Sequence, residues 1–327
     1  MLHILGMGCF HPSNVLDNEF IVSLGGDTTV EWIMDKIGIE TRVTTLPLDY
    51  IRETKNQDTR LGREVASHTP TALGVKAGEE ALRRAGIGPE KIGLVIGDTC
   101  TPNDLAPCEA QRVAHGLGII APAYDVQTAC PAFALHMDYL SGFREEMLPE
   151  YVLCVSTAAM TQKVNYNDRT DGAIWGDGAA AWVVSTQHEG KLRLLDTVFA
   201  ADPSRCGAVV VDTFGFFRQD GRAVRDFSVR QTVRLLKAFE EKHGIDWTKD
   251  IFVGHQANTT MLRQIAENRE IPPSSHWHNV THLGNQAAAG APAVIAQNWN
   301  DIKPGQKIAV AVIGAGLSWG AVLVEGV

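Results

Sequence analysis

The sequence predicts an α/β fold built from two similar halves. The prediction depends on a unit of amphipathic helix, glycine-containing turn and short apolar strand that occurs twice. In the first half a helix over 71–85 precedes an apolar run over 92–96, and in the second half a helix over 228–243 precedes the run 251–253. Runs this short are typical of buried strands, and repeated helix–strand units are typical of α/β architectures.

The remaining elements follow in chain order. We expect a first strand over 2–7, a helix over 28–36 that ends near Gly38, and a polar surface excursion over 44–63. Gly-x-Gly turns lead into the last strand of each half, at 179–185 and 317–324. We therefore expect two buried sheets covered by helices, with an N-terminal half of residues 1–186 and a C-terminal half of residues 187–327.

The composition is that of a globular protein and excludes several functions. The 327 residues are 45% hydrophobic and 20% charged, with a net charge of −9 that argues against nucleic acid or an anionic membrane as partner. No apolar run approaches the roughly 20 residues that a membrane span needs, and the N-terminus shows no secretory signal. Six scattered cysteines without a C-x-x-C pair indicate reduced thiols, so we expect a cytoplasmic location.

The stretch 124–140 carries the strongest chemical signal. An extended segment over 123–126 runs into a tight turn, and an apolar run begins after Cys130. Because proline suits the first turn of a helix, Pro131 predicts that Cys130 is the N-cap of a buried helix. The positive end of the helix dipole would lower the pKa of the thiol and favour a nucleophile, whereas the alternative is an inert core cysteine.

Two segments of the second half offer partners for this thiol. His255 follows a buried strand, at the edge where α/β sheets place their ligands, and Asn285 opens a helix of small residues. Taken singly, His255 is as compatible with a core histidine, and Asn285 with a helix cap. Together with Cys130 they predict a Cys–His–Asn catalytic site.

Two further patterns are not assigned to cofactors. His276-Trp-His278 with His282 lacks a neighbouring thiol or carboxylate cluster, so no metal site is expected. Gly314-x-Gly316 is followed by a strand, which argues against a dinucleotide loop. We expect no bound cofactor.

The ordered set of motifs resembles β-ketoacyl-acyl carrier protein synthase III over nearly the whole chain. The resemblance implies the thiolase fold, with two similar halves in a five-layered αβαβα arrangement, and a homodimer. The motifs that carry it are Asp125…Ala129-Cys130, Trp175-Gly-Asp-Gly178, Gly254-His-Gln-Ala-Asn258, Gly284-Asn285 and Gly314-Ala-Gly-Leu-Ser-Trp-Gly320.

The resemblance also implies a reaction. Cys130 would accept an acyl group from acyl-CoA, and His255 and Asn285 would donate hydrogen bonds to a malonyl thioester as it loses CO₂. The malonyl group would arrive on acyl carrier protein or on CoA. The backbone N–H groups of Cys130 and Ala315 would form the second oxyanion site.

The same resemblance implies how the acyl-CoA is held. It places Thr28, Trp32, Lys36 and Asn258 at the CoA site, with Trp32 stacking on the adenine. Ala106 occupies the position of a phenylalanine that limits the acyl pocket from across the dimer, and Phe133 could fill the same space. Medium-length or bulky acyl groups are therefore expected.

Departures from the family pattern bear on the partner. Pro131 and Ala132 replace the usual residues after the nucleophile, Gln162 stands where a second CoA-binding arginine is expected, and Ala315 replaces a glycine. Near the expected carrier-docking surface, the sequence has Thr259-Thr260, Glu267 and Asp226 instead of basic residues.

Three functions follow from these observations. The favoured one is decarboxylative condensation, in fatty-acid synthesis or in a specialised lipid or secondary-metabolite pathway. The first alternative is acyl transfer to an alcohol or amine with His255 as general base. The second is a silent subunit of a heterodimeric synthase, which has no need to retain Cys130, His255 and Asn285 together.

Overall fold

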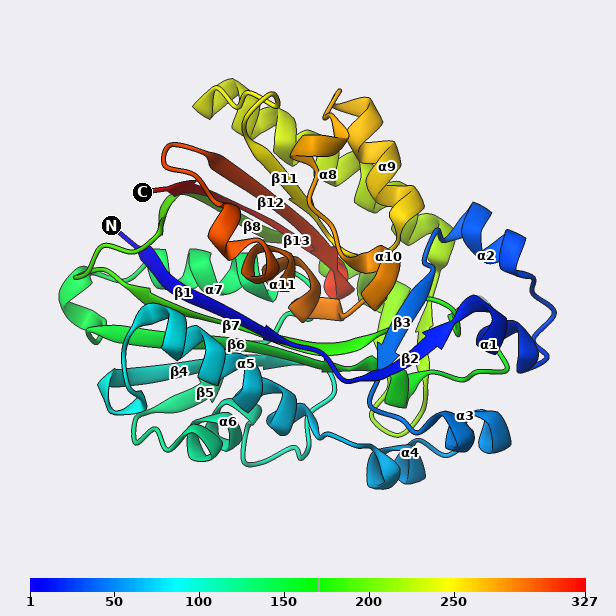
Figure 1. Cartoon of the computed structure of the whole chain (residues 1–327). Coiled ribbons are helices and arrows are strands. Elements are labelled where there is room, and N and C mark those ends of the chain that lie inside the picture. The colour runs from blue at the N-terminus through cyan, green and yellow to red at the C-terminus, as the bar shows by residue number, and fades with distance from the viewer. Residues whose placement is uncertain (170) are drawn as a thin grey trace.

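The computed structural model describes residues 1–169 and 171–327. In this part of the chain nine strands form one hydrogen-bonded sheet (Figure 1). Their order across the sheet is β11 (Ile251–Gly254), β12 (Lys307–Gly314), β13 (Ser318–Gly326), β8 (Leu192–Ala201), β1 (His3–Phe10), β7 (Asp177–Ser185), β6 (Tyr151–Ala159), β4 (Ile92–Thr99) and β5 (Ala123–Asp125).

The sheet consists of two half-sheets with the same topology. The order β4-β6-β7-β1 in one half corresponds to β11-β12-β13-β8 in the other. In both, the first pair is parallel and the next two pairs are antiparallel. The expected separation into two sheets is corrected in one respect, because β1 and β8 join the halves through His3↔Arg193 and Ile4↔Leu192. The proposed division between residues 186 and 187 lies in the connection from β7 to β8.

Helices cover both half-sheets and fill the space between them, which gives five layers (Figure 1). The outer layer of the first half is α5 (Pro70–Ala85) with α6 (Glu109–Leu117). The outer layer of the second half is α8 (Gly221–His243) with α9 (Thr259–Asn268). Between the half-sheets lie α7 (Ala132–Ser141), which packs on β8, β13 and β12, and α11 (Gly290–Gln297), which packs on β1, β7 and β11.

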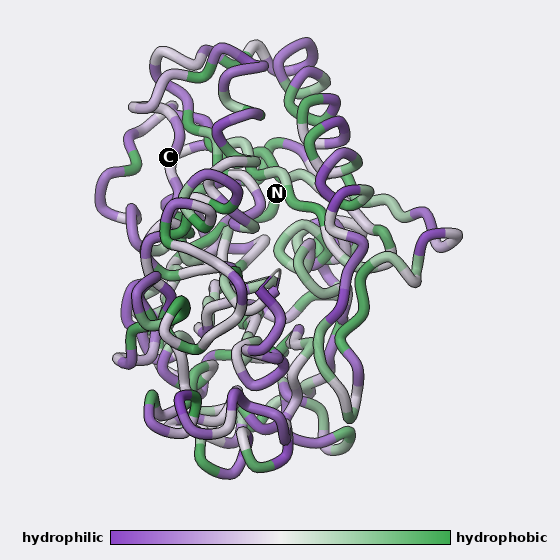
Figure 2. Tube along the Cα trace, turned by 90° about the vertical axis from the view of Figure 1, so that its right-hand side faces the viewer, coloured by the Kyte–Doolittle hydropathy of each residue, from purple (hydrophilic) through white to green (hydrophobic). Residues whose placement is uncertain are grey.

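The layers follow from the hydrophobic pattern of each helix. The central helices are apolar on most faces, and every residue of α11 from Gly290 to Ala296 is buried. The outer helix α5 is amphipathic and buries Leu73, Ala77 and Ala81 against the sheet. Hydrophobic segments accordingly run through the interior, while hydrophobic and hydrophilic residues alternate along the peripheral helices (Figure 2).

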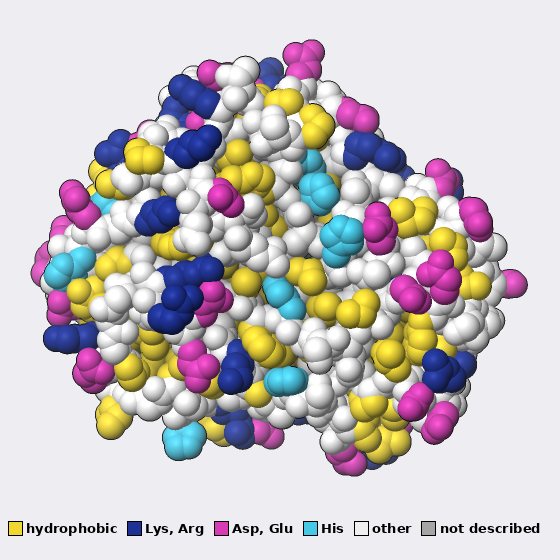
Figure 3. All heavy atoms as spheres, in the orientation of Figure 1, with side chains coloured by type: hydrophobic (Ala, Val, Ile, Leu, Met, Phe, Trp, Pro, Cys, Tyr) yellow, Lys and Arg dark blue, Asp and Glu magenta, His cyan; other side chains and the backbone are white. Residues whose placement is uncertain are grey.

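Smaller elements flank the two halves. The predicted helix over 28–36 is α2 (Val30–Lys36), and the predicted surface excursion over 44–63 contains two short helices. Acidic side chains are frequent on the part of the surface that these elements form (Figure 3). No helix within residues 1–169 or 171–327 is both long and apolar enough to cross a membrane. Besides α2, the smaller elements that flank the two halves are α1 (Asn18–Ser23), α3 (Leu48–Thr54), α4 (Thr59–Val65), α10 (Val280–Leu283), β2 (Asn14–Asp17), β3 (Thr41–Thr44), β9 (Val209–Val211) and β10 (Phe217–Gln219).

Candidate active site

Cys130 lies in the turn between β5 and α7, one residue further from the helix than expected. Helix α7 begins at Ala132, and Pro131 rather than Cys130 is its N-cap. The cause is a tight turn in which Ala129 adopts φ 56° and its carbonyl accepts the N–H of Ala132 at 3.0 Å. Because the turn closes at Ala132, the helix begins at Ala132 and not at Pro131.

The predicted low thiol pKa is wrong for this structure. Burial of the sulfur, together with the negative charge of Asp98, raises the pKa of Cys130 to about 12, against a smaller opposing effect of a backbone hydrogen bond. Because Cys130 lies one residue further from the helix than predicted, the desolvation of its thiolate has a larger effect on the pKa than the helix dipole has. Without a substrate Cys130 is therefore a thiol at neutral pH.

The end of β12 packs directly against Cys130. A Cβ at Gly314 would lie 2.5 Å from Pro131 Cδ and 3.1 Å from both the Cβ and the backbone N of Cys130, so only glycine fits there. The next residue is Ala315, whose carbonyl accepts a 2.6 Å hydrogen bond from Ser318 Oγ. This packing puts the backbone of Ala315 in the segment adjoining Cys130, as the second oxyanion site requires.

His255 follows β11, the parallel neighbour of β12. Its side chain is 8% exposed, and burial lowers its pKa to about 4, which makes the imidazole neutral at pH 7. Nδ1 of the ring is buried without a hydrogen-bond partner in the described part of the chain. A neutral imidazole can donate one hydrogen bond to a substrate, which agrees with a donor role rather than an ion pair with Cys130.

Asn285 is held by its backbone and by one side of its amide. Its N–H donates to Ile174 O at 2.9 Å, and its carbonyl accepts the N–H of Gly176 at 3.0 Å. Oδ1 accepts the N–H of Ala287 at 2.9 Å, so the side-chain NH₂ group remains as the donor. The preceding Gly284 has φ 74°, and a Cβ there would lie 2.9 Å from Arg42 Cγ, which explains the Gly-Asn pair.

Gln256 connects the His255 and Asn285 segments. Its Cβ would lie 3.0 Å from a Cβ at Gly290, in the helix that follows Asn285, and its Oε1 accepts the N–H of Asn279 at 2.9 Å. Because β11 and β12 are neighbours and β12 ends beside Cys130, Cys130 and His255 both lie at the carboxyl ends of these strands, and Gln256 packs against the start of the helix that follows Asn285. This is where α/β sheets place ligands.

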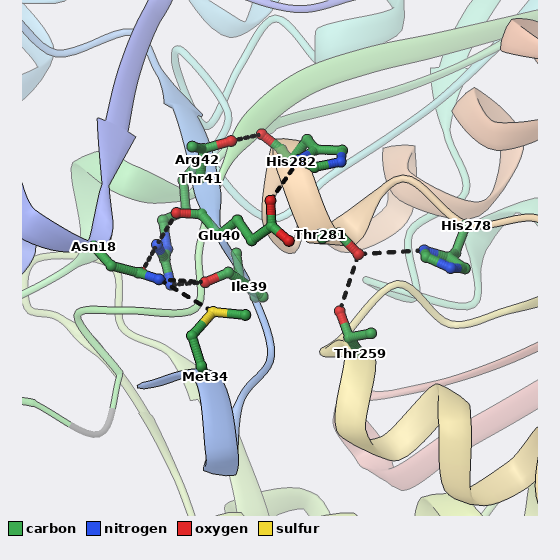
Figure 4. Close-up of polar contacts among 10 residues, drawn as sticks. All are labelled: Asn18, Met34, Ile39, Glu40, Thr41, Arg42, Thr259, His278, Thr281 and His282. Atoms are coloured by element: carbon green, nitrogen blue, oxygen red, sulfur yellow. Dashed lines mark hydrogen bonds and ion pairs between the residues drawn. The ribbon is translucent and has the colours of Figure 1, made fainter. Parts of the chain in front are cut away.

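A polar network behind the site fixes β3 and α10 against each other (Figure 4). Thr41 Oγ1 donates to His282 O at 2.7 Å, and Thr281 Oγ1 lies 3.2 Å from Thr259 Oγ1 at the start of α9. The fully buried Arg42 donates to Ala173 O at 2.7 Å. The network therefore connects α10, which precedes Asn285, both to β3 and to the start of α9, which follows Asn258.

Trp32 meets an arginine that the sequence analysis missed. The guanidinium carbon of Arg169 lies 5.3 Å from the centre of the Trp32 ring, and Arg169 Nη1 donates to Asp27 O at 2.8 Å. Gln162, which stands where the family resemblance leads one to expect a second CoA-binding arginine, is buried and donates to Thr45 Oγ1 at 3.1 Å. No sequence spacing signals a contact across 137 positions.

The other CoA-site candidates occupy distinct places. Thr28 Oγ1 is buried without a hydrogen-bond partner among the described residues. Lys36 is exposed, pairs with Asp35 at 2.7 Å, and lines a cavity of about 260 Å³ with Arg225 and Arg263. Asn258 caps α9 through a 2.8 Å bond from the N–H of Met261 to its Oδ1.

The two acyl-pocket candidates, Ala106 and Phe133, lie in different environments. Ala106 is exposed beside Leu105, which is 87% exposed, on the loop between β4 and α6. Phe133 has no exposed surface and packs edge-on against Trp182 with ring centres 5.0 Å apart, which places it in the core between α7 and β7.

A duplicated five-layered α/β fold, with a cysteine in the turn that precedes a central buried helix, is the arrangement of a condensing enzyme of the thiolase fold. One family model, for 3-oxoacyl-[acyl-carrier-protein] synthase III, matches residues 124–203, and a second, for the C-terminal part of that enzyme, matches residues 241–325. The chain belongs to the 3-oxoacyl-[acyl-carrier-protein] synthase III family, whose members are also named β-ketoacyl-[acyl-carrier-protein] synthase III.

Relatives match nearly the whole length of the chain. The synthase III of Aquifex aeolicus is 30% identical, with 98% of each chain covered. The synthase III 2 of Bacteroides thetaiotaomicron is 31% identical over 98% of this chain and 95% of its own. The crystal structure of 3-oxoacyl-[acyl-carrier-protein] synthase III from Aquifex aeolicus superposes with a TM-score of 0.87 at 29% identity, covering 99% of this chain and all of that one.

Proposed function

We propose that the enzyme loads an acyl group from acyl-CoA onto Cys130 and condenses it with a malonyl thioester. The observation that carries the proposal is the packing of Cys130 against the end of β12, beside the strand that presents His255. The synthase III relatives are named for a carrier-protein substrate, so malonyl-acyl carrier protein is the proposed second substrate.

In the first step the sulfur of Cys130 attacks the thioester carbonyl. A sulfur–carbon bond forms, the bond to CoA breaks, and the proton of the Cys130 thiol leaves with CoA as its thiol. The Cys130 thiol and the His255 imidazole are both neutral in the free enzyme. Negative charge therefore develops on the thioester carbonyl oxygen only when the sulfur attacks the bound acyl-CoA. The N–H groups of Cys130 and Ala315 then stabilise the oxyanion.

In the second step the malonyl thioester loses CO₂. The resulting enolate oxygen carries negative charge, which the neutral imidazole of His255 and the NH₂ group of Asn285 stabilise by hydrogen bonds. The enolate carbon attacks the thioester carbonyl of the acyl-enzyme, a carbon–carbon bond forms and the bond from that carbonyl carbon to the sulfur of Cys130 breaks. The thiolate that leaves takes up a proton from water. Neither donor changes its charge in this step.

The CoA moiety is proposed to stack at Trp32. Arg169 already makes a cation–π contact with the ring, and an adenine is flat enough to stack between the two side chains. Thr28 Oγ1 is a buried hydroxyl that needs a partner, and a bound nucleotide would supply one. Lys36 would contribute positive charge near the phosphates.

We further propose a homodimer. In the described sheet β5 pairs only with β4 and leaves its other edge open. Ile120, three residues before β5, is 99% exposed, and Leu105 on the neighbouring loop is 87% exposed. An open edge with large exposed apolar side chains favours association, which would also bring Ala106 to the partner's site.

Mass spectrometry and CO₂ release test the proposal together. The intact protein is incubated with a panel of acyl-CoAs, and its mass is expected to rise by one acyl group. Labelled malonyl-acyl carrier protein is then added, and labelled CO₂ is expected only with the loaded enzyme. Loading without CO₂ release would favour acyl transfer to an alcohol or amine, and the absence of loading would favour a silent subunit.

A further inference from the structure

His11 and Gln286 form a hydrogen-bonded pair beside Asn285 that has no part in the proposed chemistry. His11 directly follows β1, whose antiparallel register with β7 pairs Phe10 with Ala179. Nδ1 of His11 lies 2.8 Å from Nε2 of Gln286. Gln286 is fully buried and is the residue after Asn285 in the chain. A side chain from the first half of the protein therefore contacts the segment that carries the proposed enolate donor.

The amide group of Gln286 uses both of its hydrogens. Nε2 donates to the carbonyl of Asp177 at 2.8 Å and to Nδ1 of His11 at 2.8 Å. Because a carbonyl can only accept, the bond to Asp177 fixes which end of the amide faces His11. Burial lowers the pKa of His11 to about 4, so the ring is neutral at pH 7. Its proton then lies on Nε2, which is 3.2 Å from the side-chain amide of Gln297.

Two glycines make room for this contact. A Cβ at Gly178 would lie 2.6 Å from Nε2 of Gln286 and 2.9 Å from Nδ1 of His11, closer than a Cβ can lie without displacing its neighbours. A Cβ at Gly176 would lie 1.9 Å from the carbonyl oxygen of Leu283. The glycines on either side of Asp177 therefore let the Gln286 segment approach the start of β7.

The side chain of Gln286 holds the chain where its backbone turns away from β7. The backbone of Asn285 runs alongside residues 174–176, to which it is hydrogen-bonded. At Gln286 the backbone turns, with ψ 31°, into the short 3₁₀-helix η6 (Ala287–Ala289). The Gln286 amide continues the contact one residue further by donating to Asp177 O. The segment is thereby secured on both sides of Asn285.

The turn after Asn285 has a conformation that needs such support. Ala287 has φ 46°, in the left-handed region that favours glycine, and its N–H is the group that Asn285 Oδ1 accepts at 2.9 Å. A residue other than glycine keeps this conformation only where its surroundings fix it. If the turn relaxed, Oδ1 would lose its donor, and the Asn285 amide would be free to rotate.

We propose that His11 and Gln286 are positioning residues for decarboxylation, because they lock the turn that orients the NH₂ group of Asn285. The proposal rests on the proposed role of Asn285 as a donor to the enolate. Neither His11 nor Gln286 is a donor in the proposed mechanism, and Asn285 acts only in the second step. The pair is therefore expected to influence the release of CO₂ and not the loading of Cys130.

The first measurement compares the two steps in His11→Leu, which lacks the acceptor for Gln286. Release of labelled CO₂ by the loaded enzyme is expected to be on the order of tenfold slower, less than the 10²–10³ that loss of an oxyanion donor costs, while loading stays within about twofold of wild type. His11→Asn is the rescue variant, because asparagine Oδ1 and histidine Nδ1 are both bonded to Cγ. It is expected to release CO₂ at the wild-type rate.

The second measurement reports on the turn without any substrate. Deuterium exchange, followed by peptide mass spectrometry over residues 284–290, includes the N–H of Ala287 that Asn285 accepts. Exchange is expected to be about five- to tenfold faster in His11→Leu, the effect of one hydrogen bond, and unchanged in His11→Asn.

Ser185→Ala is the matched control. It removes a buried hydroxyl group that donates to Glu150 O at 2.6 Å, at the opposite end of β7 from Asp177. This variant is expected to unfold at lower temperature but to keep the wild-type exchange over residues 284–290 and the wild-type ratio of CO₂ release to loading. Should His11→Leu not fold, Gln286→Met gives the same comparison, because it keeps the length of the side chain and removes both donors.

Two outcomes would overturn the proposal. Wild-type exchange and CO₂ release in His11→Leu would show that the pair does not hold the turn, and an equal loss of loading and CO₂ release would show a purely structural role. Deuterium exchange does not depend on the reaction. Faster exchange in His11→Leu, together with no CO₂ release by the loaded wild type, would therefore contradict the proposed function and still support the locking of the turn.

Discussion

Asn285 allows the proposed decarboxylation to be separated from the stability of the site. Its amide has two roles in the structure: Oδ1 caps the turn before α11 by accepting the N–H of Ala287 at 2.9 Å, and the NH₂ group is the proposed donor to the enolate. Asn285→Ala removes both roles. Asn285→Asp keeps the acceptor and removes the donor.

The magnitudes follow from these two roles. Loss of one oxyanion donor costs on the order of 10²–10³ in the step that it stabilises. Loss of a capping side chain costs about 1 kcal/mol of stability, whereas aspartate caps as well as asparagine. We expect both variants to release CO₂ from the malonyl thioester on the order of 10²–10³ more slowly, and only Asn285→Ala to unfold at lower temperature.

The assay combines three measurements on each variant. Intact mass gives the rate of Cys130 loading, labelled CO₂ gives the rate of decarboxylation, and thermal unfolding followed by circular dichroism gives stability. Loading is expected to stay within a few-fold of wild type, since Asn285 acts only in the second step. Release of CO₂ by Asn285→Asp at the wild-type rate would refute the donor role.

Two further substitutions test the substrate-binding assignments. Ala106→Phe is expected to slow loading from octanoyl-CoA and leave loading from acetyl-CoA unchanged, because each buried methylene contributes up to about 0.8 kcal/mol; equal chain-length profiles for variant and wild type would show that Ala106 does not set the pocket. Arg169→Ala is expected to raise KM for acyl-CoA about 2- to 30-fold with little change in kcat, because a cation–π contact contributes about 0.5–2 kcal/mol. Arg60→Ala, at an exposed arginine, is the control. An unchanged KM in Arg169→Ala would exclude Arg169 from the CoA site.

The sequence predicted those parts of the fold that depend on local pattern. Helix α5 ends at Gly86 with φ 69°, as the glycine after the amphipathic run indicated, and the short apolar runs are buried strands. The join between β1 and β8 was missed, because pairing over two residues between distant segments leaves no periodic signal.

The site shows the same division. The order of the motifs identified the family, but the start of α7 depends on the turn at Ala129. The raised pKa of Cys130 depends on the burial of the thiol and, to a smaller extent, on the charge of Asp98, which lies 32 positions earlier. Proline alone favoured a helix start one residue too early. The contact between Trp32 and Arg169 is likewise tertiary, and Gln162, which the family resemblance placed at the CoA site, is buried in the fold.

The most direct test of the central claim is the site of acylation. Wild type and Cys130→Ala are incubated with acyl-CoA, and the acylated position is mapped by peptide mass spectrometry across all six cysteines. We predict one acyl group on Cys130 in wild type, and none in Cys130→Ala, which should retain its thermal unfolding curve. A stable acyl-enzyme in Cys130→Ala, or acylation of another cysteine in wild type, would contradict the account.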